Sequence, residues 1–180
     1  MNSGVLTIDD ISSKNTPAIV DYLNEKGISA ILFAIWQNVE HYYEEAIYAV
    51  RNGMIIGNHS YSHPAFSSLS TEECIEEIER CETVLSKLYL DAGVERKYRP
   101  FRFPYGDKGG INKNSLQRYL KEQGFHKVTY TQITYPWWKE NSLDKWYRYT
   151  LDFWFWWVSD SYGVSLYQRN SMGKNSWYKS

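Results

Sequence analysis

The stretch Gly57–Pro64, with the sequence GNHSYSHP, is the part of this 180-residue chain that decides its fold and its chemistry. It places His59 and His63 four residues apart, so both imidazoles can turn toward one point. The stretch directly follows the short apolar run Met54–Ile56, which predicts a buried β-strand. Two histidines at the end of a buried strand predict a metal or catalytic site at that edge.

Two other segments carry polar side chains at the ends of predicted strands. The acid pair Asp9 and Asp10 follows the apolar run Val5–Ile8, and the turn Arg102–Gly106 (RFPYG) ends the run Pro100–Phe103. In parallel α/β folds the working residues lie where strands end and loops begin. The acid pair, the histidine pair and the arginine turn therefore predict one site on one face of the sheet.

Strand and helix patterns alternate along the first 133 residues. Strands are expected over Val5–Ile8, Ala30–Ile35, Met54–Ile56, Pro100–Phe103 and Lys127–Ile133. Helices are expected after a Thr16 cap, over His41–Arg51, after the capping box Ser70–Glu73 and over Asn112–Gln123. Five βα repeats predict an α/β fold with a parallel strand core. A complete (β/α)₈ barrel needs roughly 200 residues or more, so we expect a distorted, incomplete (β/α) barrel.

The composition indicates one domain over residues 1–180, with clear βα repeats in 1–133 and a divergent, tryptophan-rich segment in 134–180. Seven of the eight tryptophans lie between Trp137 and Trp177. The net charge of −1 argues against nucleic acid as a partner, and no apolar run is long enough to span a membrane. Cys74 and Cys81 are expected to be buried free thiols. No feature of the sequence specifies an oligomeric state.

A metal site is the simplest use of the histidine pair. Asp10, His59 and His63 would supply one oxygen and two nitrogen donors. Such a set, with open positions for water and substrate, suits a catalytic Zn²⁺, or Co²⁺, Ni²⁺, Mn²⁺ or Fe²⁺ in a similar geometry. A bound divalent metal lowers the pKa of water and polarises a carbonyl oxygen, so the set predicts a hydrolase.

The remaining residues of the three segments suggest the other catalytic roles. Asp9 would stand beside the metal as the general base, and Arg102 is its expected partner, holding the carboxylate ionised and oriented. Tyr105 lies in a Pro-Tyr-Gly turn, where its backbone N–H could face a developing oxyanion.

These segments resemble those of the polysaccharide deacetylases, the NodB-homology domain of carbohydrate esterase family four. The stretches Thr7–Asp10, Gly57–Pro64 and Phe101–Gly106 are similar to the acid, histidine and arginine motifs of that family, and the resemblance runs from Val5 to about Phe125. It implies a distorted (β/α) barrel, a divalent metal that is commonly zinc, and removal of acetyl groups from peptidoglycan, chitin oligomers or acetylxylan. By position, it implies the same metal ligands, base, arginine partner and oxyanion donor.

The sequence departs from the family pattern in two places. Ile11 replaces the glycine that usually follows the acid pair, and no histidine follows His126, although the family expects a late histidine that protonates the leaving group. Losing a general acid costs on the order of 10²–10⁴ in rate. Because an amide nitrogen needs that proton more than an ester oxygen does, we expect ester deacetylation to survive better than N-deacetylation.

Three functional interpretations follow. The first is a metal-dependent deacetylase acting on a carbohydrate polymer, the second a catalytically impaired glycan-binding relative on the same scaffold, and the third a metallohydrolase of another ester or amide class. The aromatic run Phe153–Trp157 is expected either to fill the core or to stack on sugar rings. The resemblance implies an extracellular or cell-surface protein, but Met1–Gly4 does not open a secretory signal, which leaves a cytoplasmic location open.

Overall fold

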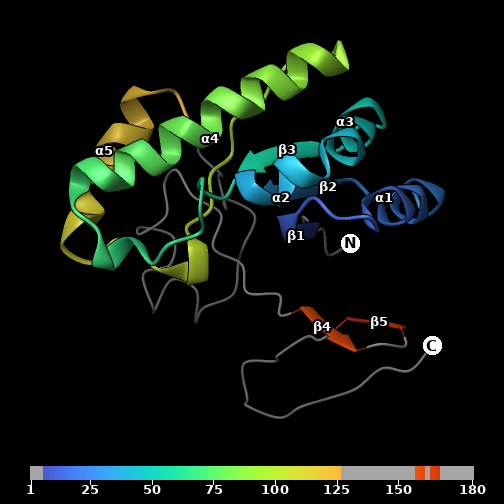
Figure 1. The fold of residues 1–180 in the computed structure, drawn as a ribbon, viewed down its shortest axis with the longest axis horizontal. Helices are drawn as coiled ribbons and strands as arrows, with labels where there is room; N and C mark the ends of the chain where they lie inside the picture. The colour runs from blue at the N-terminus through green and yellow to red at the C-terminus, as the bar shows by residue number, and fades with distance from the viewer. Residues whose placement is uncertain (1–5, 127–156, 161–162, 167–180) are drawn as a thin grey trace, which may run out of the picture.

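The computed structural model describes residues 6–126, 157–160 and 163–166 of the chain (Figure 1). Its strands are β1 (Leu6–Ile11), β2 (Ala30–Ala34), β3 (Ile55–Asn58), β4 (Trp157–Asp160) and β5 (Gly163–Leu166). Its α-helices are α1 (Thr16–Glu25), α2 (Trp36–His41), α3 (Tyr43–Arg51), α4 (Thr71–Ala92) and α5 (Lys113–Glu122). Short 3₁₀ turns are η1 (Phe66–Ser68), η2 (Pro104–Gly106) and η3 (Gly110–Asn112).

The first three strands form a parallel sheet in the order β1-β2-β3. Leu32 of β2 lies opposite Ile8 of β1 and Ile56 of β3, so the apolar runs align across the sheet. The carboxyl ends of all three strands therefore reach the same edge, which carries the acid pair and the histidine stretch. Strands β4 and β5 form a separate antiparallel pair.

The expected strand over Pro100–Phe103 is reduced to a single parallel bridge between Phe101 and Asn58. The Asn58 N–H donates to the Pro100 carbonyl, and the Arg102 N–H donates to the Asn58 carbonyl. Pro100 and Pro104 have no N–H to donate, so the pairing of this segment with β3 is limited to these two hydrogen bonds. The bridge still aligns the arginine turn with the end of β3.

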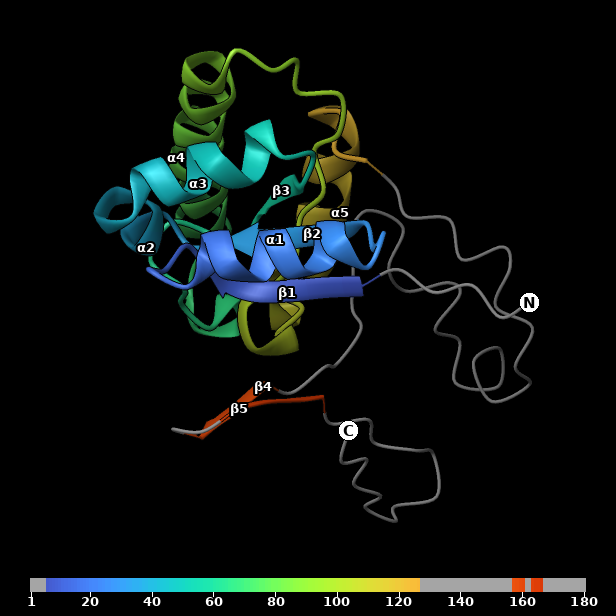
Figure 2. The same cartoon turned by 90° about the vertical axis from the view of Figure 1, so that its right-hand side faces the viewer.

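Helices cover the sheet (Figures 1 and 2). The buried side chains between them form two hydrophobic clusters. The first cluster joins the sheet to α1, α3 and the C-terminal half of α4. The second lies where the N-terminal half of α4 meets α5 and the arginine segment, and it contains Phe66, Phe101 and Phe103. The long helix α4 contributes to both clusters, so it ties the sheet to the segment that carries Arg102.

Several local signals behave as the sequence predicts. Ser70 and Glu73 form a reciprocal capping box at the start of α4, whose expected apolar stripe is buried: Cys74, Ile78, Cys81, Leu85 and Leu88. Two helix starts differ from expectation. Asn15 precedes α1, while the Thr16 hydroxyl accepts from the Ser13 N–H and makes no cap. The helix expected over His41–Arg51 begins at Tyr43 as α3, and the preceding residues Trp36–His41 form a separate short helix, α2. The expected strand over Lys127–Ile133 lies outside the described residues.

Candidate metal centre

The three predicted metal ligands come together at the carboxyl edge of the sheet. Nε2 of His59 lies 3.5 Å from Oδ1 of Asp10, and Nε2 of His63 lies 3.4 Å from the same oxygen. One donor atom from each residue falls within 4.8 Å of the other two. Donors about 2.0–2.1 Å from a tetrahedral ion lie about 3.3–3.4 Å apart, so the set fits a small divalent cation such as Zn²⁺.

A break in β1 brings both adjacent acids to the site. Neighbouring side chains in a strand point to opposite faces, so Asp9 and Asp10 could not otherwise share one centre. The pairing of β1 with β2 shifts register between Ile8 and Ile11, and Asp10 has a left-handed backbone with φ of 61°. The side chain of Asn38 donates to the Asp10 carbonyl at 2.8 Å, which holds this turn.

Left-handed backbone at non-glycine residues is concentrated at this centre. Within the described residues four non-glycine positions have positive φ: Asp10, Ser60, His63 and Tyr105. Each such residue costs about 1–3 kcal/mol when it lies in a sparsely populated region, and such residues cluster at functional sites. Asp10, His63 and Tyr105 of the arginine turn are therefore directed by backbone conformations that are unfavourable in themselves and must be held by the surrounding structure.

His59 is oriented and kept neutral by its surroundings. Its Nδ1 lies 2.8 Å from the Arg102 carbonyl, so Nδ1–H donates there and the Nε2 lone pair points at Asp10. Burial lowers the pKa of His59 below 6.5, although the charges of Asp9 and Asp10 and the hydrogen bond to the carbonyl act to raise it. A neutral imidazole with its second nitrogen fixed by a carbonyl is the usual state of a metal ligand.

His63 lies on the solvent side of the cluster. Its N–H donates to the Ser60 hydroxyl at 3.0 Å, which closes the turn between the two histidines. Its ring makes T-shaped contacts with the ring of His59, with centroids 4.9 Å apart, and with that of Tyr105, with centroids 4.5 Å apart. Tyr105 is 63% exposed in the left-handed turn η2, so the predicted oxyanion donor borders the open side of the centre.

Asp9 pairs with Arg102 as expected. Nη1 of Arg102 lies 2.6 Å from Oδ1 of Asp9, and the guanidinium also lies 4.5 Å above the ring of Phe33. The arginine side chain is only 5% exposed, while that of Asp9 is 34% exposed. A buried cation therefore holds one carboxylate oxygen and leaves the rest of Asp9 open toward solvent.

Sequence reasoning missed the supports beneath the centre. Phe33, fully buried at the end of β2, lies under both His59 and Arg102. Asn58 precedes His59 and is fully buried, with its side chain hydrogen-bonded to helix α4. Its position within the histidine stretch was the only available signal, because its partners are distant in sequence.

Comparison with known proteins decides the family. The sequence profile of polysaccharide deacetylases matches residues 2–128, which contain all three motifs. The chain belongs to the polysaccharide deacetylase family. A peptidoglycan-N-acetylglucosamine deacetylase of Bacillus cereus is 32% identical to it over 133 residues, which are 73% of this chain and 45% of that protein.

Solved structures of polysaccharide deacetylases share the fold. A crystal structure of a peptidoglycan N-acetylglucosamine deacetylase superposes with a TM-score of 0.56 at 31% identity, over 67% of this chain and 53% of the other. A family 4 carbohydrate esterase from Streptomyces lividans gives 0.56 at 27% identity, over 69% of this chain and 60% of the other. The expected α/β class, an incomplete (β/α) barrel, is confirmed. The chain spans about half the length of the curated relative from Bacillus cereus.

Proposed function

We propose that this polysaccharide deacetylase homologue is a metal-dependent hydrolase that removes acetyl groups from a carbohydrate polymer. The observation that carries the proposal is the convergence of Asp10, His59 and His63 beside the Asp9–Arg102 pair. It combines a donor set for a divalent cation with a carboxylate that is held but still open to solvent. Relatives named peptidoglycan and chitin deacetylases support the same chemistry.

The residues divide the work of hydrolysis among them. A divalent cation, for which Zn²⁺ is our first candidate, would supply Lewis-acid polarisation of the acetyl carbonyl and would make water more acidic. Asp9 takes a proton from the attacking water, and Arg102 keeps its carboxylate ionised and aimed. The Tyr105 N–H donates to the oxygen that becomes negative as the carbonyl carbon turns tetrahedral. When the tetrahedral carbon collapses, its bond to the sugar nitrogen or oxygen breaks, and that atom takes up a proton from Asp9 or from water. The products are acetate and the free amine or hydroxyl of the sugar.

The substrate in this proposal is a glycan that carries N- or O-acetyl groups, such as peptidoglycan, chitin oligomers or acetylxylan. We place the approach of the polymer at the side of the centre bordered by His63 and by Tyr105, which is 63% exposed. Because such polymers lie outside the membrane, we place the working protein at the cell surface or beyond it. Among the described residues, no helix has the length and apolar character to cross a membrane.

Acetate release tests the proposal directly. The 180-residue chain is incubated with Zn²⁺ and each of the three glycans, alongside Asp9→Asn and the control Asp21→Asn, which removes an exposed carboxylate on α1. We expect release by the wild type and by Asp21→Asn, and a loss of about 10²–10⁴ in rate for Asp9→Asn. Glycan binding without acetate release would instead favour the impaired, glycan-binding relative. Turnover of non-sugar acyl esters that glycans do not affect would favour another class of metallohydrolase.

A further inference from the structure

Asn58 occupies the junction between the two segments that carry the centre. Its backbone hydrogen-bonds to Pro100 and Arg102, the residues before and after Phe101. Its side-chain oxygen accepts from the Ser60 N–H at 2.8 Å. Its side-chain nitrogen donates to the Ile78 carbonyl and to Oε1 of Glu82, each at 3.0 Å. Every polar group of this fully buried residue is therefore engaged, and its side chain is anchored on helix α4.

Glu82 is the charged end of that anchor. Besides Asn58, its carboxylate accepts two hydrogen bonds from the Arg96 guanidinium, at 2.9 and 3.0 Å, and one from Nε of Arg99 at 3.0 Å. The side chains of Glu82 and Arg96 are only 12% and 10% exposed. A carboxylate that accepts two hydrogen bonds from one guanidinium is fixed in its orientation as well as in its distance from the arginine. Glu82 thus holds Asn58 on one side and the connection that leads into Pro100 on the other.

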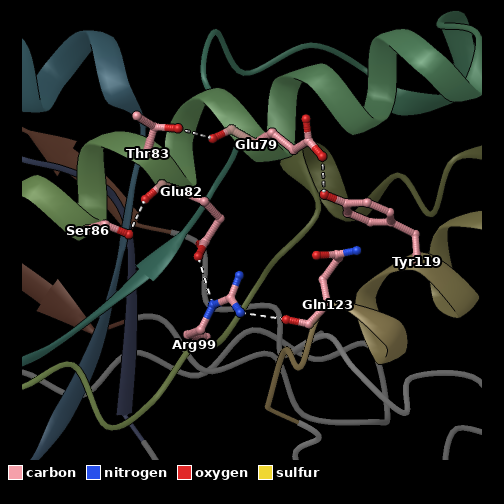
Figure 3. Close-up of a pocket in the computed structure, with 7 residues that line it drawn as sticks. All are labelled: Glu79, Glu82, Thr83, Ser86, Arg99, Tyr119 and Gln123. Atoms are coloured by element: carbon pink, nitrogen blue, oxygen red, sulfur yellow. Dashed lines mark hydrogen bonds and ion pairs between the residues drawn. The ribbon is translucent and has the colours of Figure 1, made fainter.

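Figure 3 shows the Glu82–Arg99 part of this arrangement, which lines a surface hollow of about 320 Å³ between α4 and α5. Glu82 and Arg99 meet on one wall, and Arg99 also donates to the Gln123 carbonyl. One turn earlier on α4, Glu79 accepts from the Tyr119 hydroxyl at 3.0 Å. Glu79 and Glu82 therefore lie on the same wall, but of the two only Glu82 hydrogen-bonds to Asn58.

The contacts continue from Asn58 to the reacting groups. The Asn58 carbonyl holds the Arg102 N–H at 2.9 Å, and the Arg102 carbonyl in turn accepts from the His59 ring. The other end of Arg102 holds Asp9. A tilt of Asn58 would therefore move one metal ligand and the partner of the base together.

We propose that Glu82, through Asn58, is a positioning residue that holds His59 and Arg102 in register with the metal site. Arg96 and Arg99 fix the Glu82 carboxylate through their hydrogen bonds to it. The expected effect on kcat rests on the proposed function. The expected effect on metal binding does not require that the protein releases acetate.

The test compares Glu82→Gln with the matched control Glu79→Gln. Both substitutions remove one carboxylate from the same wall of α4, and only the first weakens the anchor of Asn58. The Zn²⁺ dissociation constant is measured by competition with a chromophoric chelator, and the visible spectrum of the Co²⁺ form reports ligand geometry. We expect Glu82→Gln to weaken Zn²⁺ binding by about tenfold, to change the Co²⁺ spectrum and to lower kcat with KM unchanged, as is typical of changes behind a metal ligand. Glu79→Gln should match the wild type in all three.

A purely structural role would give a different result. Glu82→Gln would then unfold at a lower temperature while binding Zn²⁺ with the wild-type constant, and that outcome overturns the proposal. If Glu82→Gln does not fold, Arg99→Met decides, since Arg99 is 36% exposed and its loss removes one contact from Glu82. A wild-type Zn²⁺ constant and Co²⁺ spectrum for Arg99→Met would then overturn the proposal. Wild-type protein that binds Zn²⁺ without releasing acetate would refute the proposed function and leave this metal-binding test intact.

Discussion

Substitution of Gly57 by alanine tests how closely Phe33 packs against the candidate metal centre. A Cβ at this position would lie 2.6 Å from Cε1 and 2.7 Å from Cδ1 of Phe33, and 3.0 Å from Cγ of Pro100. Ordinary contact begins at 3.4 Å, so the Phe33 ring would have to retreat by 0.8 Å. That ring is fully buried, and its neighbours include His59 and Arg102. Gly57→Ala therefore displaces the ring that supports the candidate metal site.

The expected magnitude follows from overpacking. Extra methyl groups in a packed core cost about 1–3 kcal/mol. In a chain of this size each kcal/mol lowers the unfolding temperature by about 2–4 °C. Because the displaced ring lies under His59, a candidate metal ligand, we also expect Zn²⁺ affinity to fall by about tenfold. Thermal unfolding of the metal-free protein and Zn²⁺ competition measure the two effects separately.

Gly93→Ala provides the control. Gly93 ends α4 with φ of 70° and has no atom within 4 Å of its added Cβ, so its cost comes from left-handed backbone alone, about 1–2 kcal/mol. It should lower the unfolding temperature comparably and leave Zn²⁺ affinity unchanged. The reasoning is refuted if Gly57→Ala binds Zn²⁺ as the wild type does, or if its stability is unaltered.

Three further predictions concern acid stability, capping and leaving groups. Burial acts to raise the pKa of Glu82, but hydrogen bonds and charge from Arg96, with help from Asn58 and Arg99, hold it below 4.5. The resulting stability is present above pH 4.5 and is lost as the pH falls through the lower folded pKa, so urea unfolding should show a steeper acid loss for the wild type than for Glu82→Gln. Ser70→Ala removes the capping box of α4 and should cost about 1 kcal/mol in thermal unfolding without changing Zn²⁺ affinity. Because the sequence has no histidine after His126, this chain should release acetate faster from acetylxylan than from chitin oligomers of equal acetyl content; equal rates would show that another group protonates the nitrogen.

Much of the fold could be predicted because its signals are local. Ser70 and Glu73 lie three residues apart, and the buried stripe of α4 repeats at helical spacing, so both are legible in the sequence. The apolar runs before Asp9 and His59 predicted two parallel strands that end at one edge, and the structure has them. The candidate ligands converge because that edge is shared.

What could not be predicted depends on contacts distant in sequence or on backbone detail. The register shift that turns Asp9 and Asp10 to one site arises from pairing with β2 and is not encoded in the acid pair itself. The link from Asn58 to Glu82 spans 24 residues. The reduction of the Pro100–Phe103 strand to one bridge follows from Pro100 and Pro104, which have no N–H to donate to β3. The run Phe153–Trp157 lies outside the described residues except for Trp157, the first residue of β4.

Zinc titration of the chelator-treated protein, with acetate release as the readout, tests the central claim most directly. The account predicts no release without metal, and a linear rise in activity that reaches its plateau at about one Zn²⁺ per chain, because Asp10, His59 and His63 form one donor set. Acetate release that survives complete chelation, or a protein that binds no Zn²⁺ at all, would contradict it.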